Sequence, residues 1–140
     1  MYNEELLQPM RKEVSSLGIG EIKTAQEIDD VMKDAQGTLF VFVNSVCGCS
    51  AGSARPSLKI ALKNSVLPDK MITVFAGQDE STAQARKYFT GFAPSSPSMF
   101  LLRDGKVVHA IERWQIEGRP PHVIAERLSD AFNEYCSVSA

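Results

Sequence analysis

The sequence is poor in cysteine, in long apolar runs and in signals for export. Its three cysteines among 140 residues do not form the dense disulfide framework of small secreted domains. No apolar run is long enough to span a bilayer. Residues 1–10 carry two carboxylates where a signal peptide has a basic start and an apolar core. These absences predict a cytoplasmic protein, in which a close cysteine pair indicates redox exchange or metal binding.

The sequence also lacks an excess of charge of either sign. Its 15 basic and 17 acidic side chains give a formal net charge of −2 and are spread along the chain. Nucleic acids and anionic membranes recruit clusters of Lys and Arg, and the sequence has no such cluster. We therefore expect neither nucleic acid nor a membrane among the partners.

Length and composition indicate one domain. A chain of 140 residues of which 44% are apolar has the usual size of one domain and enough side chains for one core. The sequence contains no linker, internal repeat or low-complexity tract. The expected domain therefore covers residues 1–140.

Two amphipathic segments open the chain. Apolar residues recur at helical spacing from Leu6 to Leu17 and stop before Gly18. Thr24 and Glu27 have the spacing of a capping box, which predicts the start of a second helix. We therefore expect two leading helices.

A strand–helix–strand unit follows these helices. Leu39 to Val43 is wholly apolar and Met71 to Phe75 is nearly so, which is typical of central strands covered on both faces. The segment between them has room for one crossover helix that begins near Cys49 and is kinked at Pro56. Strands joined in this way are parallel, and the crossover is right-handed.

The second half of the chain predicts a helix and a hairpin. We expect Asp79 to cap a helix that ends at Gly91. Asp104-Gly105 separates two apolar segments, residues 99–102 and 106–111. An Asp-Gly pair in this setting is a strong signal for a two-residue hairpin turn. These two strands should therefore be antiparallel.

A last amphipathic helix is predicted from Ile124 to Tyr135, where apolar residues recur at helical spacing. The order of elements defines the expected fold class, α/β, with a mixed central sheet and helices on both faces. This is the order of a thioredoxin-like fold, with extra helices at the N-terminus.

The cysteine pair in Cys47-Gly48-Cys49 falls between the first predicted central strand and the crossover helix. At a helix start, unpaired backbone N–H groups and the positive end of the helix dipole favour a thiolate over a thiol. Cys47 follows the strand directly and should be exposed, whereas Cys49 should lie in the first helical turn. We therefore expect Cys47 to be the more reactive cysteine and to attack first.

A disulfide between these two cysteines would close a very small ring. An extended chain puts residues i and i+2 roughly 6.6 to 7.2 Å apart, at or beyond the limit of about 6.8 Å between disulfide-linked Cα atoms. Bridging Cys47 and Cys49 needs a bent backbone, which Gly48 permits. Strained disulfides exchange readily, so the pair suits turnover better than a structural bridge.

Two other interpretations of the pair are open. The cysteines could be ordinary small residues, but a helix start is a setting in which cysteines are reactive. A closed zinc site needs four ligands, and the chain adds only Cys136, His109 and His122, with the histidines at spacings that match no familiar finger. Redox exchange is therefore favoured. A non-catalytic thiol protein that senses oxidants or binds metal through Cys47 and Cys49 is the alternative, and turnover separates the two.

Several segments of the sequence occur together in one known family. They are Asn44-Ser-Val-Cys-Gly-Cys49, Ala54-Arg55-Pro56, Val74-Phe-Ala-Gly-Gln-Asp79, Tyr88-Phe-Thr-Gly91 and Pro94-Ser-Ser-Pro-Ser-Met99. In these segments the chain resembles the bacilliredoxin family, and the likeness covers nearly its whole length. The resemblance implies a thioredoxin-fold oxidoreductase that removes bacillithiol from mixed disulfides on cytosolic proteins. It implies bacillithiol as a low-molecular-weight thiol co-substrate and no tightly bound cofactor.

The resemblance also implies roles for individual residues. Cys47 would be the attacking cysteine, Cys49 the resolving cysteine, and Pro97 the proline that faces them before the next strand. About 5 to 6% of X-Pro bonds in folded proteins are cis. With the resemblance, we nevertheless expect the Ser96-Pro97 bond to be cis and its loop to lie against the cysteines.

The sequence departs from thioredoxin itself at the site. Val46 stands where thioredoxin has a tryptophan, and Leu39 to Val43 holds no carboxylate to match its buried acid. Proton transfer to Cys49 therefore has no assigned partner. Arg55 has two interpretations. It could stabilise the Cys47 thiolate or bind an anionic thiol, or it could be an ordinary solvated or ion-paired side chain. We leave it outside the catalytic set.

Two further residues are expected to be bystanders. Cys136 lies at the end of the last predicted helix and has no assigned step in a cycle of Cys47 and Cys49. His109 is expected to be a satisfied surface or core side chain, because lone histidines on strands usually are.

Overall fold

The computed structural model describes residues 2–34 and 36–136. In these residues the strands form a five-stranded sheet in the order β1-β3-β2-β4-β5. β2 pairs in parallel with β3 and antiparallel with β4, so the sheet is mixed, as predicted. The strands are β1 (Gly20–Glu21), β2 (Thr38–Asn44), β3 (Lys70–Phe75), β4 (Ser98–Arg103) and β5 (Lys106–Ile111).

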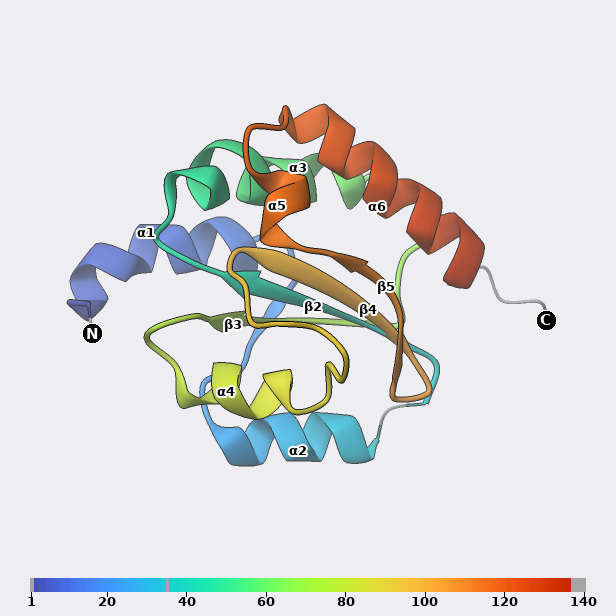
Figure 1. Cartoon of the computed structure of the whole chain (residues 1–140), viewed down its shortest axis with the longest axis horizontal. Coiled ribbons are helices and arrows are strands. Elements are labelled where there is room, and N and C mark those ends of the chain that lie inside the picture. The colour runs from blue at the N-terminus through green and yellow to red at the C-terminus, as the bar shows by residue number, and fades with distance from the viewer. Residues whose placement is uncertain (1, 35, 137–140) are drawn as a thin grey trace.

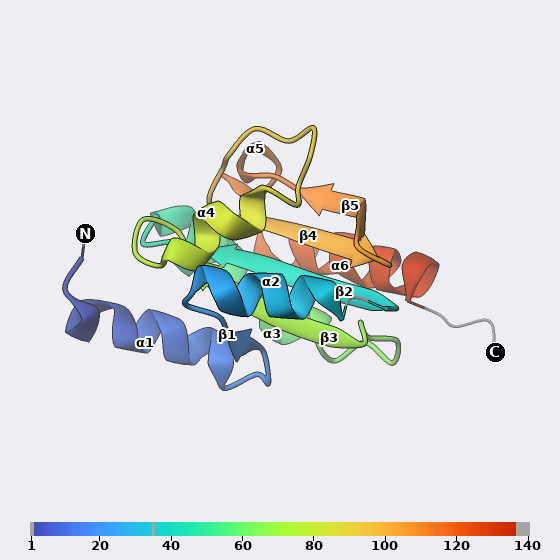
Figure 2. The ribbon, with the colours of Figure 1, turned by 90° about the horizontal axis from the view of Figure 1, so that it is seen from below.

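Helices cover both faces of the sheet (Figure 1). One layer holds α1, α3 and α6, and the opposite layer holds α2 and α4, as the view turned by 90° also shows (Figure 2). The helices are α1 (Glu4–Ser15), α2 (Ala25–Lys33), the π-helical segment η1 (Ser50–Ala54), α3 (Arg55–Ala61), α4 (Glu80–Arg86), α5 (Arg113–Ile116) and α6 (Pro121–Tyr135). The predicted fold class is therefore confirmed.

β2 is buried along its whole length because the sheet is covered on both sides. Successive side chains of a strand point to opposite faces. Phe40 and Phe42 accordingly pack in the core beneath α3 and α6. Leu39, Val41 and Val43 pack in the second core, beneath α2 and α4. The central position of β2 fixes the place where the chain leaves the sheet at Asn44, just before the cysteine pair.

The crossover between β2 and β3 runs through η1 and α3, as predicted. At Pro56, where we predicted a kink, the helix changes type. The π-helical turns of η1 end at Ala54, and Pro56 lies in the first turn of α3. The helical path is continuous here, since the Arg55 N–H donates to the Ser50 carbonyl. Pro56 has no N–H and cannot extend this π-helical pattern of hydrogen bonds between residues five apart.

The prediction for the segment after β3 was partly wrong. α4 ends at Arg86 rather than at Gly91. Beyond Arg86 the chain continues in tight turns, in which backbone N–H groups donate to carbonyls three residues earlier. Asp79 precedes α4, but its side chain caps no helical N–H. Its carboxylate instead accepts hydrogen bonds from the buried Arg11 guanidinium.

Two local signals were confirmed. Thr24 and Glu27 form the predicted capping box at the start of α2. Asp104 and Gly105 have φ angles of 49° and 84°, and a two-residue turn with positive φ at both positions matches the twist of an antiparallel hairpin. β1 and α5 had not been predicted.

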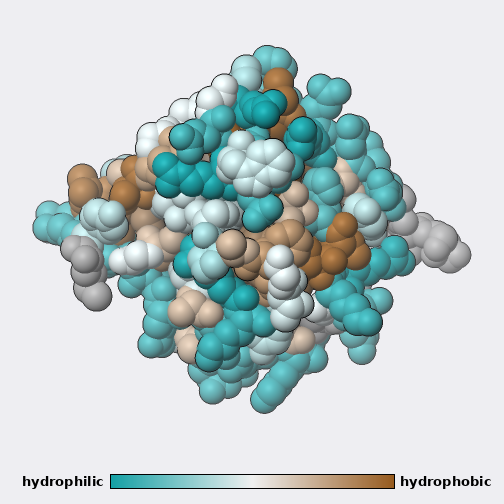
Figure 3. All heavy atoms as spheres, viewed as in Figure 1, coloured by the Kyte–Doolittle hydropathy of each residue, from teal (hydrophilic) through white to brown (hydrophobic). Residues whose placement is uncertain are grey.

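Figure 3 shows a face of the molecule on which hydrophilic side chains dominate. Apolar side chains gather there beside the edge strand β5, whose residues are mostly half-buried. Within the part of the chain that the structure describes, no helix is both long enough and apolar enough to cross a membrane.

Candidate active site

The cysteine pair lies where β2 gives way to the crossover helix. Cys47 falls between β2 and η1, and Cys49 is the N-cap residue of η1. The Cys47 carbonyl accepts hydrogen bonds from the backbone N–H groups of Ser50 (2.9 Å) and Ala51 (3.2 Å). The prediction that Cys47 lies within one turn of the helix is therefore confirmed. All three cysteines of the chain are free thiols.

Cys47 and Cys49 are in the same burial class, but their pKa values are shifted in opposite directions. We predicted that Cys47 is exposed and Cys49 withdrawn, yet both are half-buried. The pKa of Cys47 lies below its ordinary value, because the Cys49 thiol and backbone N–H donate hydrogen bonds to its sulfur and Arg113 adds positive charge. The pKa of Cys49 lies above its ordinary value, because of burial and then of its contact with the Cys47 sulfur. Cys47 is therefore the favoured thiolate.

The backbone hydrogen bond to the Cys47 sulfur is direct. The Cys49 nitrogen lies 3.4 Å from Cys47 Sγ, and the Cys47 N–H donates to Ser45 Oγ at 3.3 Å. Gly48, between the cysteines, is exposed and does not have a positive φ. A Cβ at this position would meet nothing within 4 Å. The thiol form therefore does not require glycine here, and the role of Gly48 in a bridged form stays a prediction.

A buried polar network supports the chain on either side of the pair. One guanidinium nitrogen of Arg55, Nη1, donates to Asn44 Oδ1 (3.0 Å), the Ser45 carbonyl (2.9 Å) and Ser50 Oγ (3.2 Å). Ser50 Oγ and the Ser45 N–H also donate to Asn44 Oδ1. The network ties the end of β2 to the first turn of η1, which fixes the loop that carries Cys47.

Arg55 is ion-paired rather than solvated. Its Nε lies 2.8 Å from Glu13 Oε1, and its side chain is only 4% exposed. The sequence left this alternative open beside a contact with the thiolate or an anionic thiol. Because its guanidinium is already bonded to Glu13 and to the buried network, Arg55 is a positioning residue for the loop.

The loop before β4 lies against the cysteine pocket. The Ser96-Pro97 peptide bond is cis, as predicted, and Ser98 begins β4. Ser96 and Cys47 both line one open pocket of about 430 Å³. The loop is fastened by a hydrogen bond from Ser98 Oγ to the Ser95 carbonyl at 2.9 Å.

Two arginines of this pocket were missed by the sequence analysis. Arg86, from the last turn of α4, and Arg113, from α5, line the pocket together with Cys47. Nothing in the sequence near either arginine marks it as a neighbour of the cysteines. The approach of Arg113 depends on α5, a four-residue helix that is too short to show a periodic pattern.

Cys136 and His109 lie outside the pocket. Cys136 is 6% exposed, and burial raises its pKa. It contacts Thr38, at the other end of β2, which is roughly 20 Å long at about 3.3 Å per residue. Burial also lowers the pKa of His109. Contrary to our expectation of a satisfied side chain, His109 Nε2 has no hydrogen-bond partner within residues 2–34 and 36–136.

The arrangement offers a nucleophile but no cluster of metal ligands among the described residues. In that part of the chain, no three His, Cys, Asp or Glu side chains lie close enough together to hold a metal ion. The chemistry available at the pocket is that of a stabilised thiolate, a second thiol two residues away and two nearby guanidinium groups.

Solved structures share this fold. A thioredoxin from Halobacterium salinarum superposes with a TM-score of 0.57 at 18% identity, over 86% of this chain and 93% of that one. Thioredoxin f from spinach chloroplast gives a TM-score of 0.57 at 15% identity, over 91% of this chain and 94% of that one. These similarities show that the fold is that of thioredoxin.

Residues 2–136 match the family described as Disulphide isomerase. This match, the fold and the cysteine pair at the end of β2 define a thiol-disulfide oxidoreductase. The chain is 50% identical to a bacilliredoxin of Koribacter versatilis, over 100% of this chain and 97% of that protein. It is 52% identical to a bacilliredoxin of Bacillus licheniformis, over 96% and 95%. The chain belongs to the bacilliredoxin family.

Proposed function

We propose that the protein removes bacillithiol from mixed disulfides on cytoplasmic proteins. Its partners are then S-bacillithiolated proteins and bacillithiol itself, and no tightly bound cofactor takes part. The observation that carries the proposal is the hydrogen bond from the Cys49 N–H to Cys47 Sγ at 3.4 Å, at a sulfur that lines an open pocket. A thiolate held in this way can reach a disulfide that enters from solvent.

In the first step the Cys47 thiolate attacks the bacillithiol sulfur of the mixed disulfide. A bond forms between Cys47 Sγ and that sulfur, and the bond between bacillithiol and the client breaks. The electron pair of the broken bond goes to the client sulfur, which leaves as a thiolate and takes a proton from water. The product is a Cys47–bacillithiol adduct and a repaired client.

In the second step Cys49 resolves the adduct. Its thiol loses a proton to solvent, and the thiolate attacks Cys47 Sγ, which releases bacillithiol as a thiolate and forms the Cys47–Cys49 disulfide. Two equivalents of a low-molecular-weight thiol then reduce this disulfide and are themselves oxidised to a disulfide. If ring strain slows internal closure, a low-molecular-weight thiol can resolve the adduct directly. Both routes pass through the same adduct.

Intact-mass spectrometry on two variants tests the proposal. An S-bacillithiolated model protein is incubated with the wild-type protein, with Cys49→Ala and with Cys47→Ala. The wild-type protein should release bacillithiol from the client. Cys49→Ala should retain one bacillithiol on Cys47, because the second step is lost. Cys47→Ala should leave the client modified.

The same experiment distinguishes the alternatives. An adduct on Cys49 with Cys47 dispensable would reverse the two roles. The non-catalytic thiol protein would be favoured by two results together. The client would stay modified with all three proteins, and the wild type would retain zinc in native mass spectra. Glutathionylated client serves as the control for the identity of the thiol, and equal release from both clients would contradict a preference for bacillithiol.

A further inference from the structure

The pocket that contains Cys47 is positively charged. It is lined by Arg86 and Arg113, and none of its lining residues is acidic. Its volume of about 430 Å³ lies within the usual range for small-molecule sites, about 300 to 1,000 Å³. The pocket therefore combines a nucleophilic sulfur with two cations in a space suited to a small ligand.

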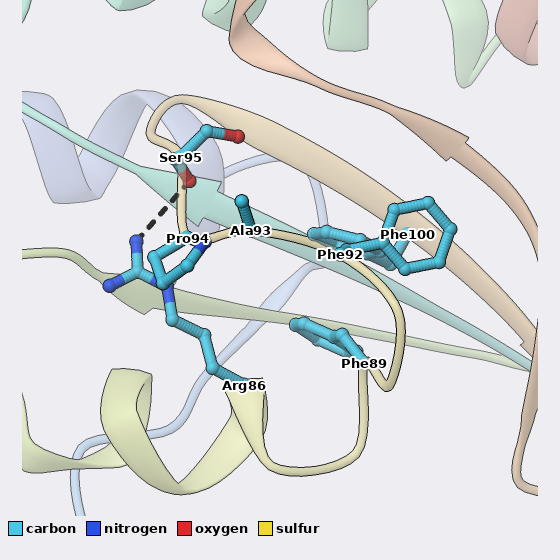
Figure 4. Close-up of a pocket in the computed structure, with 7 residues that line it drawn as sticks. All are labelled: Arg86, Phe89, Phe92, Ala93, Pro94, Ser95 and Phe100. Atoms are coloured by element: carbon cyan, nitrogen blue, oxygen red, sulfur yellow. Dashed lines mark hydrogen bonds between the residues drawn. The ribbon is translucent and has the colours of Figure 1, made fainter.

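Arg86 is held over the pocket by the loop before β4. Its Nη2 donates to the Ser95 carbonyl at 3.2 Å, and Figure 4 shows its side chain passing Pro94 to reach this oxygen. Behind the loop, the rings of Phe89 and Phe100 stack with centroids 3.9 Å apart, and Phe92 packs edge-on against Phe100. The aromatic cluster gives the loop, and through it Arg86, a defined position.

Arg113, from α5, contacts the same loop. Its Nη1 donates to the Ser96 carbonyl at 3.3 Å, next to the carbonyl that Arg86 contacts. Its Nε pairs with Glu117 at 3.0 Å, with side chains 45% and 61% exposed. Ion pairs between exposed side chains contribute little to stability because solvent screens them, so Glu117 is a weak competitor for an incoming anion.

Other arginines of the molecule show how unusual Arg86 is. Buried Arg11 pairs with Asp79 at 2.7 Å, and buried Arg55 pairs with Glu13 at 2.8 Å. Arg86 is half-buried, yet among residues 2–34 and 36–136 no carboxylate lies within ion-pair distance of it. Partial burial lowers the pKa of Arg86, because removal from water disfavours the charged guanidinium. A bound anion would stabilise that charge.

We infer that Arg86 and Arg113 form a carboxylate-binding subsite for the low-molecular-weight thiol with which Cys47 exchanges. The inference rests on the proposed function, because it assumes that Cys47 attacks a small thiol held in a disulfide. The guanidinium groups hold a carboxylate of that thiol through charge-assisted hydrogen bonds. Its sulfur is then kept beside Cys47, and thiols without a negative charge are selected against.

Three disulfides of matched length and different charge test the subsite. They are dithiodipropionate, which is anionic, hydroxyethyl disulfide, which is neutral, and cystamine, which is cationic. The rate of mixed-disulfide formation on Cys47 is measured by intact mass in the Cys49→Ala background, where the adduct persists. Each rate is divided by the rate at which free mercaptoethanol reacts with the same disulfide. This division removes differences in the intrinsic reactivity of the probes. The normalised rate should be about tenfold higher for the anionic than for the neutral probe.

Arginine variants show whether the preference comes from this pair. Arg86→Gln and Arg113→Gln should each lower the anionic-to-neutral ratio about fivefold, and Arg86→Lys should restore part of it. Arg113 also lowers the pKa of Cys47, but the ratio cancels that effect because both probes meet the same thiolate. Arg103→Gln, an exposed arginine at the far end of β4, removes the same charge and should leave the ratio unchanged.

The outcomes separate this inference from the proposed function. Rapid exchange with all three probes and a ratio unaffected by either arginine would overturn the subsite and leave the function standing. Failure of Cys47 to react with any probe would overturn the function. In that case the side-chain Nε–H NMR signals of Arg86 and Arg113 are followed during titration of a Cys47→Ser protein with mercaptopropionate. Selective shifts of these two signals would support the subsite, and their absence would overturn it.

Discussion

The two ends of β2 place cysteines in opposite environments. Beyond Asn44 the chain enters a helix start, where Cys47 receives a backbone N–H and faces the charge of Arg113, and its pKa is lowered. At the Thr38 end, Cys136 is buried, and its pKa is raised. A cysteine is therefore favoured as a thiolate at one end of β2 and is a core residue at the other. A helix start and a nearby cation make a cysteine more reactive, whereas burial among apolar side chains makes it less so.

The polar contacts at the two ends of β2 also differ. At the Thr38 end, the Thr38 N–H (2.9 Å) and hydroxyl (3.2 Å) donate to Asp69 Oδ2, and the Asp69 N–H donates back to Thr38 Oγ1 (2.9 Å). This pair joins the start of β2 to the residue that precedes β3. At the Asn44 end, a buried guanidinium supports a loop that has to stay open to solvent. The active end of the strand thus depends on a buried charge, and the inactive end does not.

The largest difference between the two ends should be catalytic. Cys47→Ser should slow exchange with hydroxyethyl disulfide by at least about a thousandfold, because it removes the nucleophile. Cys136→Ser should change the rate by less than about twofold, because Cys136 has no access to the pocket. Rates are followed by the thiol released from the disulfide. Comparable losses in the two variants would show that Cys136 takes part in the cycle.

A smaller difference should appear in stability. Arg55→Met removes the donor to Asn44, Ser45 and Ser50 and should lower the free energy of unfolding by about 3 kcal/mol. Thr38→Val, the control at the other end, leaves the backbone bond to Asp69 and should cost about 1 kcal/mol. Urea denaturation of both variants measures the difference. A larger loss for Thr38→Val would contradict the role given to the Arg55 network.

Local patterns were enough to predict the frame of the site. The apolar run from Leu39 to Val43 predicted the central strand because burial on both faces leaves no polar position in it. Asp104-Gly105 predicted the hairpin because few residues tolerate two successive positive φ angles. Cys47 was placed at the helix start because a strand and its crossover helix meet there. Each of these inferences used neighbours in the sequence.

Features that depend on distant contacts were missed or left open. β1 contains two residues, and no periodicity can be read from so short a strand. α5 is stabilised by the burial of Ile116 in the core and by a capping box at Glu112, so only the folded chain reveals it. Arg55 was considered for thiol binding, but the sequence does not show that it is buried against Glu13. Arg86 and Arg113 take up the position beside Cys47 instead.

The position of Cys47 in the fold makes it the favoured thiolate of this chain. This claim is tested most directly by the pH dependence of iodoacetamide labelling at each cysteine, resolved by peptide mass spectrometry. A lowered pKa gives a larger thiolate fraction at neutral pH, so Cys47 should be labelled first as the pH rises. Cys49 and Cys136, whose pKa values are raised, should follow only at higher pH. Labelling of Cys49 or Cys136 before Cys47 would contradict the claim.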